Sequence, residues 1–192
     1  MPPRHRRNEK QNVAQPAVRE SAGLPVAWLD EAPAGIWFVG CHGGAGTTTL
    51  SHTAHEARDG GRCWPIPHTG AVKVVLVAHP DVQGLRTAGA AARQYAEDPR
   101  LRARVRLLGL ALVSWAPGRL PRHLVQVRQS LRRAFPRIWD IEYMPELRLG
   151  ESLADMRPPK SLQTLQDDLE RMEDDHWADS LRWANQEDGD PR

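Results

Sequence analysis

Short apolar runs alternate along this chain with stretches of helical periodicity. Nearly continuous apolar runs are typical of strands buried on both faces of a sheet, and they occupy residues 36–39, 72–78, 105–114 and 138–143. Apolar residues at spacings of three and four predict helices over residues 47–57, 85–96, 121–135 and 160–184. Strands that alternate with helices predict an α/β fold, a three-layer sandwich around a mostly parallel sheet.

Two of the predicted helices have a defined apolar stripe. In 121–135 the stripe consists of Leu124, Val127, Leu131 and Ala134. In the C-terminal helix it consists of Leu162, Leu165, Leu169 and Met172. We expect residues 160–172 to dock on the sheet, and the acidic remainder of that helix to be solvated or to bind a partner.

The polar segments set the expected boundaries. Residues 1–25 have no apolar period, so we expect a disordered arm. The α/β domain then spans 26–160, an acidic helix spans 161–185, and 186–192 is a tail. Within the domain, the proline- and glycine-rich residues 60–71 are expected to be irregular.

Composition narrows the class of protein. The 192 residues carry 26 basic and 24 acidic side chains, with no run of eighteen apolar residues and no secretory leader, so we expect a cytoplasmic protein without a membrane span. A dimer is compatible with this composition. The arm residues Arg4, Arg6 and Arg7 offer a weak contact for nucleic acid or an acidic partner, although a solvated tail is the simpler interpretation.

The most informative stretch runs from residue 35 to residue 50. An apolar strand leads into a loop with glycines at 40, 43, 44 and 46, and three threonines then open a helix. Glycine lets the backbone approach an anion, and the N–H groups of such a loop point at it. The candidate phosphate-binding residues are His42, Gly43, Gly44, Ala45, Gly46, Thr47, Thr48 and Thr49. Of these, the Thr48 hydroxyl is the candidate ligand of Mg²⁺.

Two further residues follow the ends of other predicted strands. In a parallel sheet, ligands bind where the strands end, so we place Asp81 and Trp115 on the rim of the same pocket.

The loop resembles that of a known family. Residues 42–50, His-Gly-Gly-Ala-Gly-Thr-Thr-Thr-Leu, are similar to the loop Lys-Gly-Gly-x-Gly-Lys-Thr-Thr of ParA/MinD-type partitioning ATPases. Residues 74–86, 108–113 and 141–146 resemble later segments of that family. The resemblance implies a reduced P-loop-like fold that binds ATP or ADP with magnesium, and it places Pro145 near the base, as a third residue on the rim of the pocket. Residues 35–160 also resemble a family of actinobacterial proteins whose loop reads Gly-Cys-His-Gly-Gly-Ala-Gly.

The departures from the ATPase pattern predict a loss of catalysis. His42 and Thr47 stand where that family has lysines, and Asp59 and Asp81 are only the nearest candidates for its magnesium-holding carboxylates. We therefore expect nucleotide or phosphate binding without efficient hydrolysis, in an adaptor or regulatory module. One alternative is an active ATPase whose missing lysine is replaced by a group such as Arg119 or Arg122. Another is an interaction protein with a vestigial loop.

Two rival sites have weaker support. The spacing Gly40-x-x-Gly43-x-x-Gly46 is compatible with dinucleotide binding, but no acidic residue ends a second strand about twenty residues later. A zinc site would draw on residues that lack the usual tight pairing. Those residues are Cys41, His42, His52, His55, Cys63 and His68.

Overall fold

The computed structural model describes residues 23–53, 56–148 and 157–172. Its strands are β1 Val26–Glu31, β2 Ile36–Gly40, β3 Arg58–Asp59, β4 Trp64–Thr69, β5 Val72–Ala78, β6 Val105–Val113 and β7 Ile138–Ile141. Its helices are α1 Thr47–Ser51, α2 Val82–Glu97, α3 Pro99–Arg104, α4 Arg122–Leu131, α5 Pro145–Arg148 and a further helix over 160–172. A five-stranded sheet has the order β3-β2-β5-β6-β7, and β1 pairs with β4 in a second sheet.

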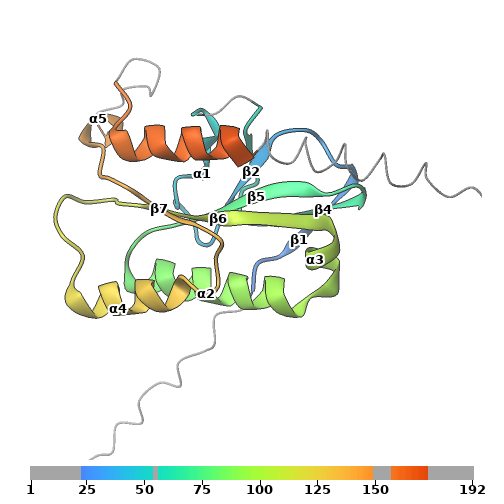
Figure 1. The fold of residues 1–192 in the computed structure, drawn as a ribbon, viewed down its shortest axis with the longest axis horizontal. Coiled ribbons are helices and arrows are strands. Elements are labelled where there is room, and N and C mark those ends of the chain that lie inside the picture. The colour runs from blue at the N-terminus through green and yellow to red at the C-terminus, as the bar shows by residue number, and fades with distance from the viewer. Residues whose placement is uncertain (1–22, 54–55, 149–156, 173–192) are drawn as a thin grey trace, which may run out of the picture.

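All strand pairs in both sheets are parallel, and helices cover the two faces of the larger sheet (Figure 1). The helices α2 and α4 lie on one face, while α1 and the helix 160–172 lie on the other. The predicted α/β sandwich with a parallel sheet is thereby confirmed.

Strand β5 supplies both halves of the core. Val74 and Leu76 belong to the core beneath α2, whereas Val75 and Val77 belong to the core beneath α1 and the C-terminal helix. Successive side chains of a strand point to opposite faces, so a central strand with helices on both sides needs apolar residues at every position. This is the physical origin of the continuous apolar run in the sequence.

The helix 160–172 docks through its predicted stripe, because Leu162, Leu165 and Leu169 are each no more than 1% exposed. Between them lies the buried carboxylate of Asp168, which accepts a hydrogen bond from the Trp139 indole N–H at 2.8 Å. The predicted continuation of this helix to 184 lies outside the described residues.

Helix α1 is shorter than predicted, since it ends at Ser51 instead of Ala57. The hydroxyls of Ser51 and Thr53 donate to the carbonyl groups of Thr48 and Leu50, at 2.8 and 2.7 Å, which are acceptors that a longer helix would use. The threonine-rich sequence also has modest helix propensity. Because the helix stops early, Arg58–Asp59 can pair with β2 as the short edge strand β3.

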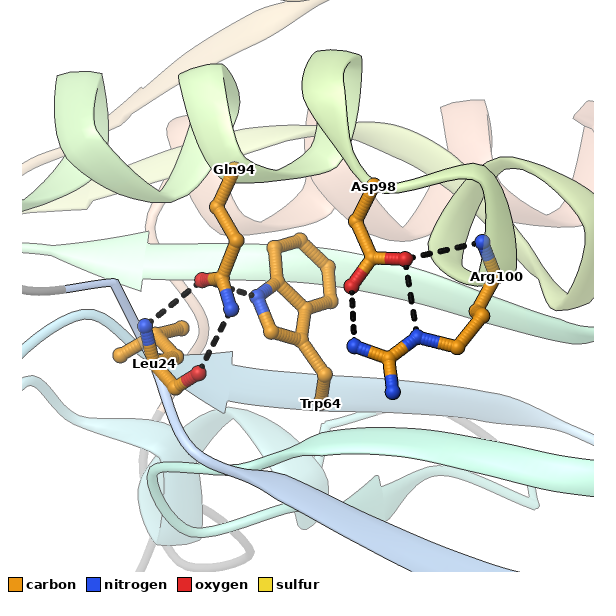
Figure 2. A network of polar contacts seen from close by, with 5 residues as sticks. All are labelled: Leu24, Trp64, Gln94, Asp98 and Arg100. Atoms are coloured by element: carbon orange, nitrogen blue, oxygen red, sulfur yellow. Dashed lines mark hydrogen bonds and ion pairs between the residues drawn. The ribbon is translucent and has the colours of Figure 1, made fainter.

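The prediction that residues 60–71 are irregular was wrong, because β4 spans Trp64–Thr69 despite two prolines. Proline removes a backbone donor. A strand with a single partner tolerates this loss, and β4 pairs only with β1 in its sheet. The predicted start of the domain at residue 26 is also too late, because the chain already packs against the domain at Leu24. Leu24 is buried, and both its N–H and its carbonyl group are bonded to the side chain of Gln94, as Figure 2 shows.

Three smaller differences concern helices. Helix α4 buries Leu124 and Leu131, but Val127 is 40% exposed and Ala134 lies beyond the helix, so its apolar face is narrower than predicted. The short helices α3 and α5 were not predicted. No helix in the described part of the chain is long and apolar enough to cross a membrane.

Candidate functional site

The glycine loop leaves the carboxyl end of β2 and leads into α1. Gly44 and Gly46 have φ angles of 70° and 99°, the left-handed region that favours glycine, and Gly46 is the N-cap of α1. A methyl group placed on Gly43 or Gly44 would meet no atom within 4 Å. Glycine is thus required at 44 and 46 by the backbone turn, and the outer face of the loop is open.

The backbone donors at the tip of the loop are mostly unused, in contrast to those on either side of it. The N–H of Cys41 donates to the carbonyl oxygen of Val77 at 2.8 Å, and that of Leu50 donates to Gly46 at 3.0 Å. Within the described residues, residues 43–44 form a turn, and no backbone carbonyl accepts from the N–H groups of Gly43, Gly44 or Gly46. Such a set of unpaired donors on an open loop is the arrangement that binds oxyanions.

A hydroxyl and a carboxylate meet beside this loop. Thr48 Oγ1 donates to Asp59 Oδ2 at 2.5 Å, and the N–H of Gly61 donates to Asp59 Oδ1 at 2.8 Å. Partial burial alone would raise the pKa of Asp59, but hydrogen bonds from Thr48, Gly61 and Thr47 outweigh it, and the pKa lies below its ordinary value. Asp59 is therefore an ionised carboxylate at neutral pH, held next to the threonine predicted to bind Mg²⁺.

Only a weak signal in the sequence points to this pairing. Asp59 was one of two candidate carboxylates, but β3 contains two residues and so presents no apolar run. The other candidate, Asp81, is used differently. It is the N-cap of α2, where its carboxylate accepts from the N–H of Gly84 at 2.7 Å.

Two histidines, His42 after β2 and His79 after β5, contact each other at the carboxyl ends of these neighbouring strands. The chain proceeds from β2 to β3 on one side and later to β5 on the other, so the strand order reverses here, and ligands favour this position in parallel sheets. The N–H of His79 donates to Nε2 of His42 at 2.9 Å, and the rings lie 4.8 Å apart. His42 Nδ1 therefore carries the proton, which it shares with the Gly43 carbonyl at 3.0 Å.

Beside these histidines lies a cleft of about 510 Å³ at the carboxyl ends of β5 and β6. Its lining includes Asp81 and Trp115, two of the three residues predicted to form a pocket rim, together with Arg119. The third, Pro145, begins α5 and does not line this cleft. The loop residues 42–49 do not line it either, so the open loop and the cleft are neighbouring but separate surfaces.

The remaining predicted residues do not assemble into a site. Among the described residues, no three His, Cys, Asp or Glu side chains form a group that could hold a metal ion. Burial raises the pKa of the Cys41 thiol to about 12, despite a hydrogen bond with Val77, so it is a core side chain. His55 and the arm residues Arg4, Arg6 and Arg7 lie outside the described residues.

A comparison with protein families assigns the chain to one of them. A family model described as a family of unknown function, DUF6668, matches residues 34–163, which is more than half of the sequence. The chain belongs to the DUF6668 family. The matched region runs from the turn before β2 into the C-terminal helix, so it contains the loop, both histidines, Asp59 and the cleft. Comparisons with curated proteins and with solved structures found no match.

Proposed function

We propose that this DUF6668 protein binds a nucleotide or another phosphate ligand on its glycine loop, without efficient hydrolysis, and acts as an adaptor or regulatory module in the cytoplasm. The observation that carries the proposal is the hydrogen bond between Thr48 and Asp59 beside the open loop. A loop hydroxyl and a carboxylate are the two protein groups that hold Mg²⁺ beside phosphates in P-loop proteins.

The residues present fit such a cation. Mg²⁺ is usually bound by one or two carboxylates together with phosphate oxygens and water, so Thr48 and Asp59 would suffice when a phosphate ligand completes the site. The ion would neutralise charge on the phosphates. The chain's own contribution would be the N–H groups of Gly43, Gly44 and Gly46, which are oriented by the left-handed glycines at 44 and 46.

The same loop argues against rapid hydrolysis. Thr47 stands where the partitioning ATPases that the loop resembles have their catalytic lysine. His42 stands where they have their second loop lysine. Nε2 of His42 accepts the N–H of His79, so this nitrogen does not donate to a phosphate in the observed hydrogen-bond arrangement. Phosphoryl transfer depends on charge aimed at the developing transition state, so binding can survive where turnover does not.

Isothermal titration calorimetry with MgATP and MgADP tests the proposal. We expect Thr48→Val to weaken binding about tenfold or more, because it removes the hydroxyl while keeping the side-chain shape. The matched control is Thr164→Val, an exposed threonine of the helix 160–172 that is no part of the candidate site and whose hydroxyl donates to the Lys160 carbonyl group at 2.9 Å. Asp59→Asn should weaken binding with Mg²⁺ and have little effect in EDTA.

Two results would contradict the proposal in different ways. If ATP, ADP and GTP at millimolar concentration all give no binding heat, the loop is not a nucleotide site. If purified protein releases phosphate from ATP and Thr48→Val abolishes that release, the protein is an active ATPase and the non-hydrolysing part of the proposal is wrong.

A further inference from the structure

The cleft beside Trp115 begins where the glycine loop ends. Nδ1 of His79 lies 2.8 Å from the carbonyl oxygen of Val113, which ties the end of β5 to the end of β6. The residues that follow these two, Pro80 and Ser114, line the cleft. On its other side, His79 holds His42 of the loop. One pair of imidazole rings therefore separates the loop from the cleft.

A methyl group on Gly46 would lie 3.6 Å from the Val113 side chain, so the loop and β6 are in contact one residue before the cleft wall. Loop and cleft thus share the carboxyl edge of the sheet and are connected through His42, His79 and Val113.

The walls of the cleft suit a flat ring. Trp115 lines the cleft and is 52% exposed, so its indole forms part of the cleft surface. Pro117, Leu120 and Pro121 add rigid apolar surface, and the volume of about 510 Å³ lies in the range of small-molecule sites. Nucleobases stack on aromatic side chains in such surroundings.

The lining of the cleft also contains an arginine paired with a carboxylate. Nε of Arg128 donates to Asp140 Oδ1 at 2.7 Å, and its Nη2 contacts the other carboxylate oxygen. An arginine that pairs through two nitrogens still has N–H groups to spare, and a carboxylate still has free lone pairs. A donor and an acceptor thus lie side by side, which suits the polar edge of a base. Arg119 adds a second guanidinium to the lining.

We propose that this cleft binds the base and ribose of a nucleoside phosphate whose phosphates lie on the glycine loop, with the base stacked on Trp115. The inference rests on the proposed function and names the ligand class. It also differs from what the ATPase resemblance implies, because that resemblance places the base beside Pro145, which does not line this cleft.

The test compares MgADP with magnesium pyrophosphate, which carries the same number of phosphates and lacks the nucleoside. For wild-type protein, calorimetry should give roughly 5- to 100-fold tighter binding of MgADP, the range that one stacked base provides. Trp115→Ala should reduce the affinity for MgADP to that for pyrophosphate and leave pyrophosphate binding unchanged. Trp115→Phe, which keeps a stacking ring, should retain most of the difference.

Trp28→Ala is the matched control, because Trp28 is also 52% exposed but lines a different cavity. It should leave both affinities unchanged. Thermal melting of each variant checks folding, and Trp115→Phe covers the case in which Trp115→Ala unfolds.

Equal wild-type affinity for the two ligands, or a Trp115→Ala protein that still prefers MgADP, would overturn this inference and leave the phosphate site standing. Wild-type protein that binds neither ligand would instead overturn the proposed function, and this inference with it.

Discussion

The side chain of Gln94 on α2 accepts a hydrogen bond from the indole N–H of Trp64 on β4, at 2.9 Å. The same oxygen accepts from the N–H of Leu24 at 2.7 Å, and the amide nitrogen donates to the Leu24 carbonyl group at 2.8 Å. Figure 2 shows that one amide thus joins the chain before β1, strand β4 and helix α2. This amide therefore joins the two-stranded sheet to α2, in addition to the packing of Trp64 and Ile66 in the core.

We predict that Gln94→Leu destabilises the protein by about 1–3 kcal/mol, because it leaves the donor of a fully buried tryptophan unsatisfied. Urea unfolding followed by fluorescence measures the change. Gln83→Leu is the control, since Gln83 is an exposed residue of the same helix, and it should change stability by less than about 0.5 kcal/mol. Equal effects of the two substitutions would show that the Gln94 contacts do not stabilise the fold.

A pH-dependent contribution is expected at the adjoining turn. The Arg100 side chain donates to both carboxylate oxygens of Asp98, at 3.0 and 2.8 Å, and lowers the pKa of Asp98 from 3.8 to about 2. A carboxyl whose pKa is lower in the folded state stabilises that state above its unfolded pKa. This contribution is lost as the pH falls from about 4 to about 2.

Asp98→Asn removes the charge while keeping a residue suited to the N-cap of α3. We predict that the variant is less stable than wild type at pH 7, and that urea midpoints of the two proteins converge near pH 2. Added salt should narrow the difference at pH 7, because Arg100 is exposed. A difference that stays constant between pH 7 and pH 2 would mean that the ion pair contributes nothing.

The sequence predicted the parts of the fold whose local pattern agrees with their final environment. Strand β5 is apolar at almost every position because it is covered on both faces, and the stripe of Leu162, Leu165 and Leu169 has the helical period of a docked helix. In both cases the buried positions recur along the whole segment, so they leave a regular pattern in the sequence. The loop at 43–46 was likewise visible, since its glycines are local features.

The parts that could not be predicted depend on distant residues. Strand β4 contains Pro65 and Pro67, which argue locally against a strand, and it forms because β1 pairs along one edge. Asp59 lies beside Thr48 only because a two-residue strand pairs with β2, a contact that leaves no period in the sequence. The same holds for His42 and His79, which are 37 residues apart.

Docking of the C-terminal helix should depend on one buried carboxylate. Asp168 is 4% exposed and accepts from the Trp139 indole, from Arg137 at 2.6 Å and from Arg171 at 3.0 Å. We predict that Asp168→Ala costs about 2–4 kcal/mol, because it leaves the donor of buried Trp139 unsatisfied and breaks a partly buried ion pair.

Hydrogen exchange should show faster exchange of the amides of residues 160–172 in Asp168→Ala than in wild type. The neighbouring Asp167 is exposed, so Asp167→Ala is the matched control and should leave exchange nearly unchanged. Unchanged protection in Asp168→Ala would show that the apolar stripe alone holds the helix.

Two glycines in α2 should respond to alanine in opposite ways. A methyl group on Gly84 would lie 2.1 Å from the carbonyl oxygen of His79, an impossible contact with backbone, whereas one on Gly89 would lie 3.5 Å from Leu131, an ordinary contact. We predict that Gly84→Ala destabilises the protein by about 1–3 kcal/mol through overpacking. Gly89→Ala should stabilise it by roughly 0.5–1 kcal/mol, because alanine favours the helix.

Urea unfolding of the two variants measures these opposite changes. Because Gly84 lies against the residue that links the loop to the cleft, its substitution has a second expected effect. The helix can relieve the contact only by moving away from His79 or by displacing it, and either shift disturbs the hydrogen bond to His42. Gly84→Ala should therefore weaken MgADP binding where the protein is still folded, while Gly89→Ala leaves the affinity unchanged. Tight binding by a folded Gly84→Ala protein would show that the ligand site does not depend on the position of His79.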